Sequence, residues 1–140
     1  MNQGVLLEQI RDCMEGVLPA VVASCASDGT PNVTYLSKVL FVDAQHVALS
    51  NQFFSKTVAN VGENPQVQIT LIQPSSGRQL RLDARFERSD GSGELFEQVR
   101  AEIDAIASVM RMQHVFRLRS VDLYRVAHAE WIASDAKPAP

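Results

Sequence analysis

Apolar and polar residues alternate along much of the chain, and this alternation predicts a protein built mainly of β-strands. Successive side chains of a strand point to opposite faces, so a half-buried strand has an apolar residue at every second position. The alternation is clearest in residues 66–74 and 78–88, whereas the unbroken run of small and β-branched residues at 20–26 is typical of a strand covered on both faces. The predicted strands are residues 20–26, 32–43, 46–51, 66–74, 78–88 and 114–131.

Helical spacing of apolar residues occurs in two other places and predicts helices there. Residues 5–14 and residues 94–110 each carry one apolar stripe, and a brief third helix is predicted from Ser55 to about Val61. Charged residues interrupt the first stretch, so it predicts an amphipathic helix and not a signal peptide. The stripes consist of Leu6, Leu7, Ile10 and Met14 in the first helix, and of Leu95, Phe96, Val99, Ile103 and Ile106 in the other.

Short turns join most of the predicted strands, and short turns favour antiparallel pairing. Asp28-Gly29 has hairpin chemistry, and the first three strands are expected to form an antiparallel meander. Closing six such strands into a barrel removes exposed sheet edges, so the chain is predicted to be a small six-stranded antiparallel barrel with peripheral α-helices. A barrel of this size is filled by its own side chains, so a sizeable ligand is expected outside it, where two subunits meet.

Length and charge narrow the classes of protein. With 140 residues the chain is expected to form one domain over residues 1–132, followed by a disordered tail at 133–140 that is small, polar and proline-bearing. The net charge of −3 gives the whole chain no attraction to nucleic acid, and no apolar run approaches the roughly 20 residues that cross a bilayer. Neither a nucleic acid nor a membrane is therefore expected as a partner.

Cysteine and histidine usage points to a cytoplasmic protein without a metal. Cys13 and Cys25 lack metal or redox spacing and are interpreted as small buried thiols in a reducing compartment. His46, His114 and His128 are scattered, so no metal site is predicted.

The start of the short third helix carries the most suggestive chemistry. Ser55, Lys56 and Thr57 put two hydroxyls and one ammonium where a helix leaves its first backbone N–H groups unpaired and partly positive. A phosphate monoester suits this combination of donors and charge. The alternative is structural, with Ser55 capping the helix and Lys56 solvated.

Polar residues on the preceding strands extend this candidate site. Ser50 and Asn51 end the strand that leads to the helix, and Tyr35, Ser37 and Lys38 lie on the strand before it. A planar heterocycle along these strands would bring its phosphate to the helix start. The alternatives are core packing for Tyr35 and a solvated or snorkelling side chain for Lys38.

The order of these features resembles the pyridoxamine 5′-phosphate oxidase-like family, the FMN-binding split barrels. The motifs are a D-G-x-P turn, a strand that ends in a small polar residue, a Ser/Lys/Thr helix start, an Asn, and an N-P entry into the next strand. The resemblance covers residues 20 to about 74 well and the last strand loosely. The matching residues are Asp28-Gly29-Thr30-Pro31, Ser50-Asn51, Ser55-Lys56-Thr57, Asn60 and Asn64-Pro65.

The resemblance implies a six-stranded antiparallel split β-barrel that forms a homodimer with FMN in the subunit interface. It implies that Ser55, Lys56 and Thr57 hold the phosphate and that Gln73 lies near the flavin. The residues that it implies along the ring and ribityl chain are Tyr35, Leu36, Ser37, Ser50 and Asn51.

The function that the resemblance implies is a small FMN-dependent oxidoreductase with an unassigned substrate. The second predicted strand has only Lys38 where the vitamin B6 oxidases are rich in arginine, and Arg125 and His128 are not spaced as in those enzymes. Residues 103–112 and 116–126 instead resemble members found beside GAF sensor domains. A non-catalytic flavin sensor or carrier, a binder of the deazaflavin F420 and a barrel without cofactor are the alternatives, and no catalytic side chain is assigned.

Overall fold

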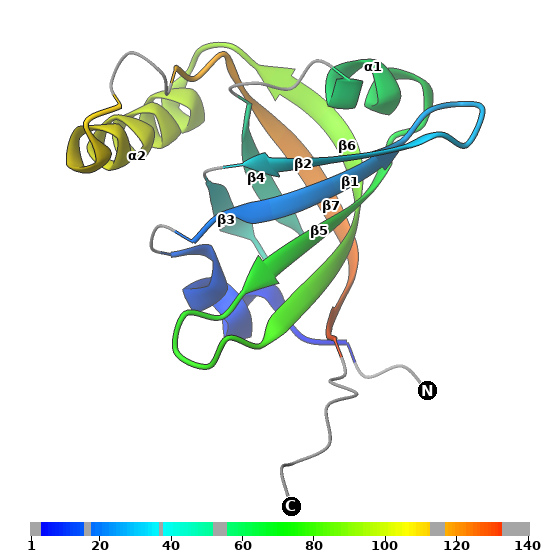
Figure 1. The fold of residues 1–140 in the computed structure, drawn as a ribbon, viewed down its shortest axis with the longest axis horizontal. Coiled ribbons are helices and arrows are strands. Elements are labelled where there is room, and N and C mark those ends of the chain that lie inside the picture. The colour runs from blue at the N-terminus through cyan, green and yellow to red at the C-terminus, as the bar shows by residue number, and fades with distance from the viewer. Residues whose placement is uncertain (1–3, 16–17, 37, 52–55, 113–116, 133–140) are drawn as a thin grey trace, which may run out of the picture.

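A seven-stranded antiparallel sheet curls into a barrel with three helices around it in the part of the chain that the computed structural model describes, residues 4–15, 18–36, 38–51, 56–112 and 117–132 (Figure 1). The order of strands across the sheet is β2-β1-β5-β6-β7-β4-β3. The helices are η1 (Leu7–Met14), α1 (Lys56–Glu63) and α2 (Glu94–Met110), and the strands are β1 (Ala20–Cys25), β2 (Pro31–Leu36), β3 (Val39–Asp43), β4 (His46–Asn51), β5 (Gln66–Ile72), β6 (Gln79–Asp90) and β7 (Ser120–Trp131).

The barrel closes where the long strand predicted over residues 32–43 is broken. Its first part, β2, pairs with β1, and its second part, β3, pairs with β4, so the sheet has seven strands and not the predicted six. One straight strand cannot bond to both ends of a closed sheet, so the chain bends between β2 and β3. The bend is bonded to β4, because Ser50 N donates to Lys38 O at 3.0 Å and Lys38 N donates to Ser50 Oγ at 3.1 Å.

The alternation that predicted β5 and β6 is confirmed by burial. The apolar residues at every second position of both strands face the interior. Phe86, the last of them in β6, is half-buried, and its ring lies 5.5 Å from that of Tyr124 in an edge-to-face arrangement. A smaller apolar cluster lies under α2, where Val99 and Ile103 pack near Ala48 and Val121. The buried residues of the alternation are Val67, Ile69 and Leu71 in β5, and Leu80, Leu82 and Ala84 in β6.

The N-terminal helix is of a different type from the predicted one, but it buries an apolar side as predicted. It is a 3-10 helix with non-helical angles at Ile10, and Leu6 of the predicted stripe is 63% exposed. An isolated helix this short is marginal, so packing against the barrel decides its geometry. Its buried side chains are Leu7, Ile10, Cys13 and Met14.

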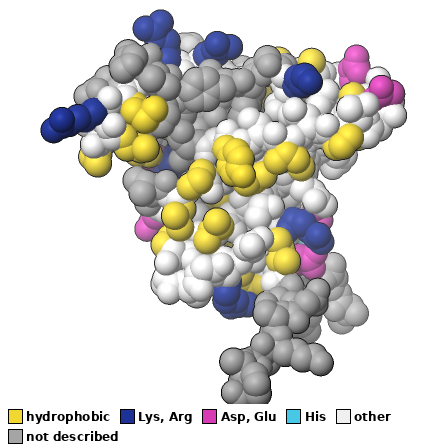
Figure 2. Space-filling model, in the orientation of Figure 1, with side chains coloured by type: hydrophobic (Ala, Val, Ile, Leu, Met, Phe, Trp, Pro, Cys, Tyr) yellow, Lys and Arg dark blue, Asp and Glu magenta, His cyan; other side chains and the backbone are white. Residues whose placement is uncertain are grey.

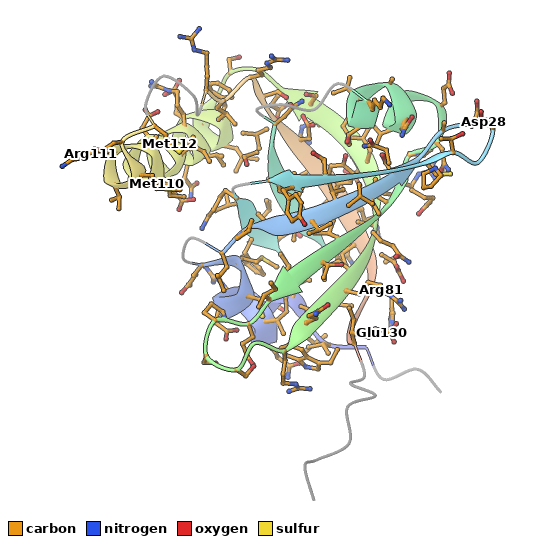
Figure 3. The ribbon with its side chains drawn as sticks, viewed as in Figure 1. Asp28, Arg81, Met110, Arg111, Met112 and Glu130 are labelled. Atoms are coloured by element: carbon orange, nitrogen blue, oxygen red, sulfur yellow. The ribbon has the colours of Figure 1, made fainter. Side chains whose placement is uncertain are left out.

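The two α-helices and the second cysteine were predicted with mixed success. Helix α2 has the predicted bounds, and its end at Met110 stands clear of the barrel in Figure 3. The short α1 runs two residues further than expected, to Glu63. Cys25 is half-buried and not fully buried as predicted.

On the other side of the molecule, an ion pair between Arg81 and Glu130 joins the neighbouring strands β6 and β7 (Figure 3).

Candidate functional site

The start of α1 is fixed on the first two strands by side-chain hydrogen bonds. Asn32 Nδ2 on β2 donates to Thr57 Oγ1 at 3.3 Å, and Asn60 Nδ2 donates to Ser24 Oγ on β1 at 3.1 Å. Thr57 and Asn60 are buried by these contacts. Because both anchors join residues far apart in sequence, the barrel sets the direction in which the first turn of α1 points.

Lys56 is the first residue of α1 and its side chain is exposed. It forms no ion pair with any residue that the structure describes. An exposed ammonium at the positive end of a helix attracts an anion, and the first backbone N–H groups of the helix add donors. Thr57 contributes a hydroxyl that can donate as well as accept. Ser55, the third predicted phosphate residue, lies outside the described residues.

The outer face of β2 is apolar and exposed. Tyr35 is 69% exposed and Val33 is 62% exposed, so Tyr35 does not pack in the core, which was the alternative interpretation. Their cross-strand neighbours on β1 are Val21 and Ala23, and Figure 2 shows the resulting band of apolar side chains over these strands. Leu36, the next predicted residue, is buried in the core. A strip of this kind suits a planar apolar ligand or another subunit.

Lys38 lies at the bend between β2 and β3, and its ammonium is engaged inside the molecule. Nζ donates to the backbone carbonyl of Met14 at 2.7 Å and lies 3.6 Å from Glu102 Oε2 on α2. Its side chain is 11% exposed and its ammonium is bonded inside the molecule, so it is not the solvated or snorkelling lysine of the alternative interpretation. Lys38 thus joins the bend to η1 and α2. Ser37, its predicted neighbour in the site, is outside the described residues.

Ser50 and Asn51, at the end of β4, are both buried in the single chain. The hydroxyl of Ser50 is held by the bend, as described above. Asn51 Nδ2 donates to Asp122 Oδ2 at 3.4 Å, and the backbone carbonyl of Asn51 accepts from Arg119 N at 2.8 Å. The structure therefore brings these residues together with Lys38 and β7, beneath the surface of the barrel.

Gln73 follows β5 at the end opposite α1. Its Nε2 donates to Asp12 Oδ2 of η1 at 3.0 Å, and its Oε1 accepts from Ser76 Oγ at 2.5 Å. Figure 1 shows the β5–β6 hairpin beside η1 and α1 at the other end of the barrel. Within one chain, Gln73 is therefore not brought together with Lys56.

Asp122 on β7 is a polar residue that sequence reasoning missed. Its Oδ1 accepts from Ser89 Oγ at 2.6 Å and from Ser120 Oγ at 2.8 Å, and the side chain is 3% exposed. Burial raises its pKa, and the bonds from Ser89, Ser120 and Asn51 oppose that rise. A carboxylate in the otherwise apolar stretch from Val121 to Tyr124 was the available signal. Burial likewise raises the pKa of Tyr124.

The described residues bear on two further features, a metal site and a membrane-spanning helix. No group of three histidine, cysteine, aspartate or glutamate side chains there is arranged to hold a metal ion. No helix in the same ranges is long and apolar enough to span a membrane.

The sequence profile of the pyridoxamine 5′-phosphate oxidase family matches residues 6–131, which is most of the chain. The chain therefore belongs to this family, and the split-barrel fold class is confirmed. The resemblance to GAF-associated members stays a prediction.

Individual relatives are more distant. The uncharacterized protein MJ0282 of Methanocaldococcus jannaschii is 35% identical over 51 residues, which cover 35% of this chain and 34% of that protein. The match therefore spans about a third of the relative's length.

Two solved structures illustrate the likeness in fold. An FMN-binding protein from Syntrophomonas wolfei subsp. wolfei has a TM-score of 0.77 at 14% identity, with 91% of this chain and 86% of that chain covered. An F420 reductase has a TM-score of 0.59 at 16% identity, with 93% and 98% covered. At these identities the likeness shows the fold alone.

Proposed function

We propose that this protein is a cytoplasmic, homodimeric FMN-binding flavoprotein that acts as a small oxidoreductase. The observation that carries the proposal is the exposed Lys56 at the anchored start of α1, next in the fold to the exposed apolar strip of β2. The ammonium of Lys56 at the helix start suits a phosphate, and the apolar strip of β2 suits a flat ring system. Family membership and the FMN-binding protein of similar fold support the same reading.

The described residues divide the work of holding FMN. Lys56, the first N–H groups of α1 and the Thr57 hydroxyl would hold the phosphate, whereas Tyr35 would contact the ring. Ser50 and Asn51 would border the ribityl chain from β4. Gln73 fits the proposal as a residue that reaches the cofactor of the partner subunit, because it lies at the far end of β5 in its own chain.

The chemistry would come from the cofactor and the selectivity from the protein. FMN supplies hydride and electron transfer when it is bound, and a protein of this kind binds, orients and shields it. A second subunit over the β2 strip would exclude water from the ring. No side chain is assigned as a general acid or base.

A titration with FMN tests the proposal directly. The wild-type protein is expected to bind FMN, and Lys56→Ala is expected to weaken binding by about 1.5–3 kcal/mol, the scale of a charge-assisted hydrogen bond. Flavin fluorescence or visible absorbance measures the dissociation constant. Arg100→Ala, which removes an exposed cation from α2, is the matched control and should leave the constant unchanged.

Three outcomes would contradict the proposal in different ways. An equal dissociation constant for wild type and Lys56→Ala would remove the phosphate from the start of α1. Tighter binding of F420 than of FMN in a parallel titration would change the cofactor. Bound flavin that NADH, NADPH and other reductants fail to bleach under anaerobic conditions would favour a sensor or carrier over an oxidoreductase.

A further inference from the structure

Asp122 is a buried carboxylate held by neutral groups. Within the described residues its hydrogen-bond partners are the hydroxyls of Ser89 and Ser120 and the amide of Asn51. The ion pairs found among the described residues do not include it. The charge of Asp90 also acts on it, and because that charge is negative it raises the pKa of Asp122 further.

Burying a carboxylate without a neighbouring cation lowers the stability of a folded protein, because the charge loses its hydration. A buried charge without a cation is tolerated when hydrogen bonds satisfy it, and an apolar residue of similar size usually packs as well or better. The same β7 segment contains Val121 and Leu123, which are buried without the cost of desolvating a charge. The carboxylate therefore serves something other than packing.

The carboxylate of Asp122 bonds to the side-chain amide of Asn51 and so acts on the orientation of that amide. Because Asp122 Oδ2 accepts a hydrogen bond from Asn51 Nδ2, the contact favours the orientation of the amide in which its NH₂ group faces Asp122. The backbone of Asn51 is fixed as well, by the bond from Arg119 N. Asn51 is the last residue of β4 and lies five positions before Lys56 in the sequence.

We propose that Asp122 is a positioning residue of the cofactor site, which orients the amide of Asn51 so that its polar atoms meet the bound flavin nucleotide in one fixed arrangement. The inference rests on the proposed function, because it assigns Asp122 a role in the same site. Asp122 itself does not touch the cofactor; it acts through Asn51.

A double-mutant cycle on FMN binding tests this role. Asp122→Asn keeps the shape but lets the amide of Asn51 turn over, and we expect the dissociation constant of FMN to rise about tenfold. Asn51→Ala should raise it by a similar factor. The double variant should bind no more weakly than Asn51→Ala, because Asp122 acts only through that amide. Asp90→Asn removes a negative charge that accepts hydrogen bonds from Arg88, and it should leave binding unchanged.

A second variant keeps the test valid if Asp122→Asn does not fold, which circular dichroism would show. Ser89→Ala with Ser120→Ala leaves the carboxylate in place but removes both hydroxyl donors, and it should raise the dissociation constant about threefold in wild type and not in Asn51→Ala.

Binding by Asp122→Asn within twofold of wild type would overturn the inference and leave the proposed function standing. Effects of Asp122→Asn and Asn51→Ala that multiply would also overturn it, as a merely structural role predicts. A wild-type protein that binds no flavin would overturn the proposed function, and this inference with it.

Discussion

Lys38 and Lys56 are the two lysines that the sequence offered for the cofactor site, and the fold gives them opposite surroundings. Lys38 is 11% exposed, bonded to the Met14 carbonyl and near Glu102. Lys56 is exposed and has no ion-pair partner within the described residues. The first is committed to holding three elements together, whereas the second is available to a ligand.

The difference shows how the surroundings of a lysine decide its use. The bend between β2 and β3 directs Lys38 between η1 and α2, where losing water must be offset by a carbonyl and a carboxylate. The start of α1 directs Lys56 outward, where its charge adds to the partial charge of the helix. A charged side chain whose hydrogen bonds and ion pair are made inside the protein is not available to bind the phosphate of a cofactor.

Removing the charge of Lys38 should have the largest effect on stability. Lys38→Met keeps the apolar stem, but it deprives Met14 O of its donor and leaves Glu102 Oε2, a buried atom, without its cation. We expect the free energy of unfolding to fall by about 2–3 kcal/mol, less than for a fully buried pair because the Glu102 side chain is 39% exposed. Urea denaturation measures the loss.

Lys56→Met is the matched control for that measurement. The same substitution on an exposed lysine should change the free energy of unfolding by less than about 0.5 kcal/mol. A loss as large as that of Lys38→Met would erase the contrast between the two lysines.

Glu102→Gln should have a smaller effect on the same contact. The amide keeps the shape but loses the attraction to Lys38, so the free energy of unfolding should fall by about 1 kcal/mol. In the Lys38→Met background the substitution should be neutral or stabilising, because the carboxylate no longer has a cation there. Independent effects of the two substitutions would show that the 3.6 Å contact contributes nothing.

His46 is an ion-paired group near the surface, and its removal should give the smallest effect, one that depends on pH. Its Nδ1 lies 2.8 Å from Asp43 Oδ1 and its Nε2 lies 3.2 Å from Glu87 Oε1. The bond to Asp43 raises the pKa of His46 most; partial burial opposes this, and Glu87 adds to the rise. The stabilisation is therefore complete below the ordinary histidine pKa of about 6.5 and is lost as pH rises through the raised value.

The comparison of wild type with His46→Gln measures this contribution. Their difference in free energy of unfolding should be largest near pH 5.5 and should shrink toward zero by about pH 9. Urea denaturation across this range is the measurement, and added salt should reduce the difference because the contacts are exposed. A difference that does not change with pH would mean that the His46 charge plays no part.

Much of the fold was predictable because alternation reports directly on burial. Leu80 and Leu82 are fully buried where the pattern put them, and α2 has the predicted bounds. The break after Leu36 was not predictable, since both halves of the long strand have strand-like sequences. Closure of the barrel forces that break, and closure is a property of the whole sheet.

The candidate site was predictable to a smaller extent. The hydroxyl and ammonium groups at the start of α1 were recognised from their order along the chain. The anchor from Asn32 to Thr57 and the Asp122 cluster were not, because each joins residues distant in sequence. A hydrogen-bond network of that kind leaves no periodic trace.

The sequence by itself determined which residues are apolar at strand and helix spacing, and so determined a small antiparallel barrel of this family. Only the tertiary structure decided that Lys38 joins the bend to η1 and α2, that Tyr35 faces outward, and that Asp122 holds Asn51. The reason is that spacing along the chain encodes which face of an element is buried, whereas the partner of a polar group depends on which distant element lies against it.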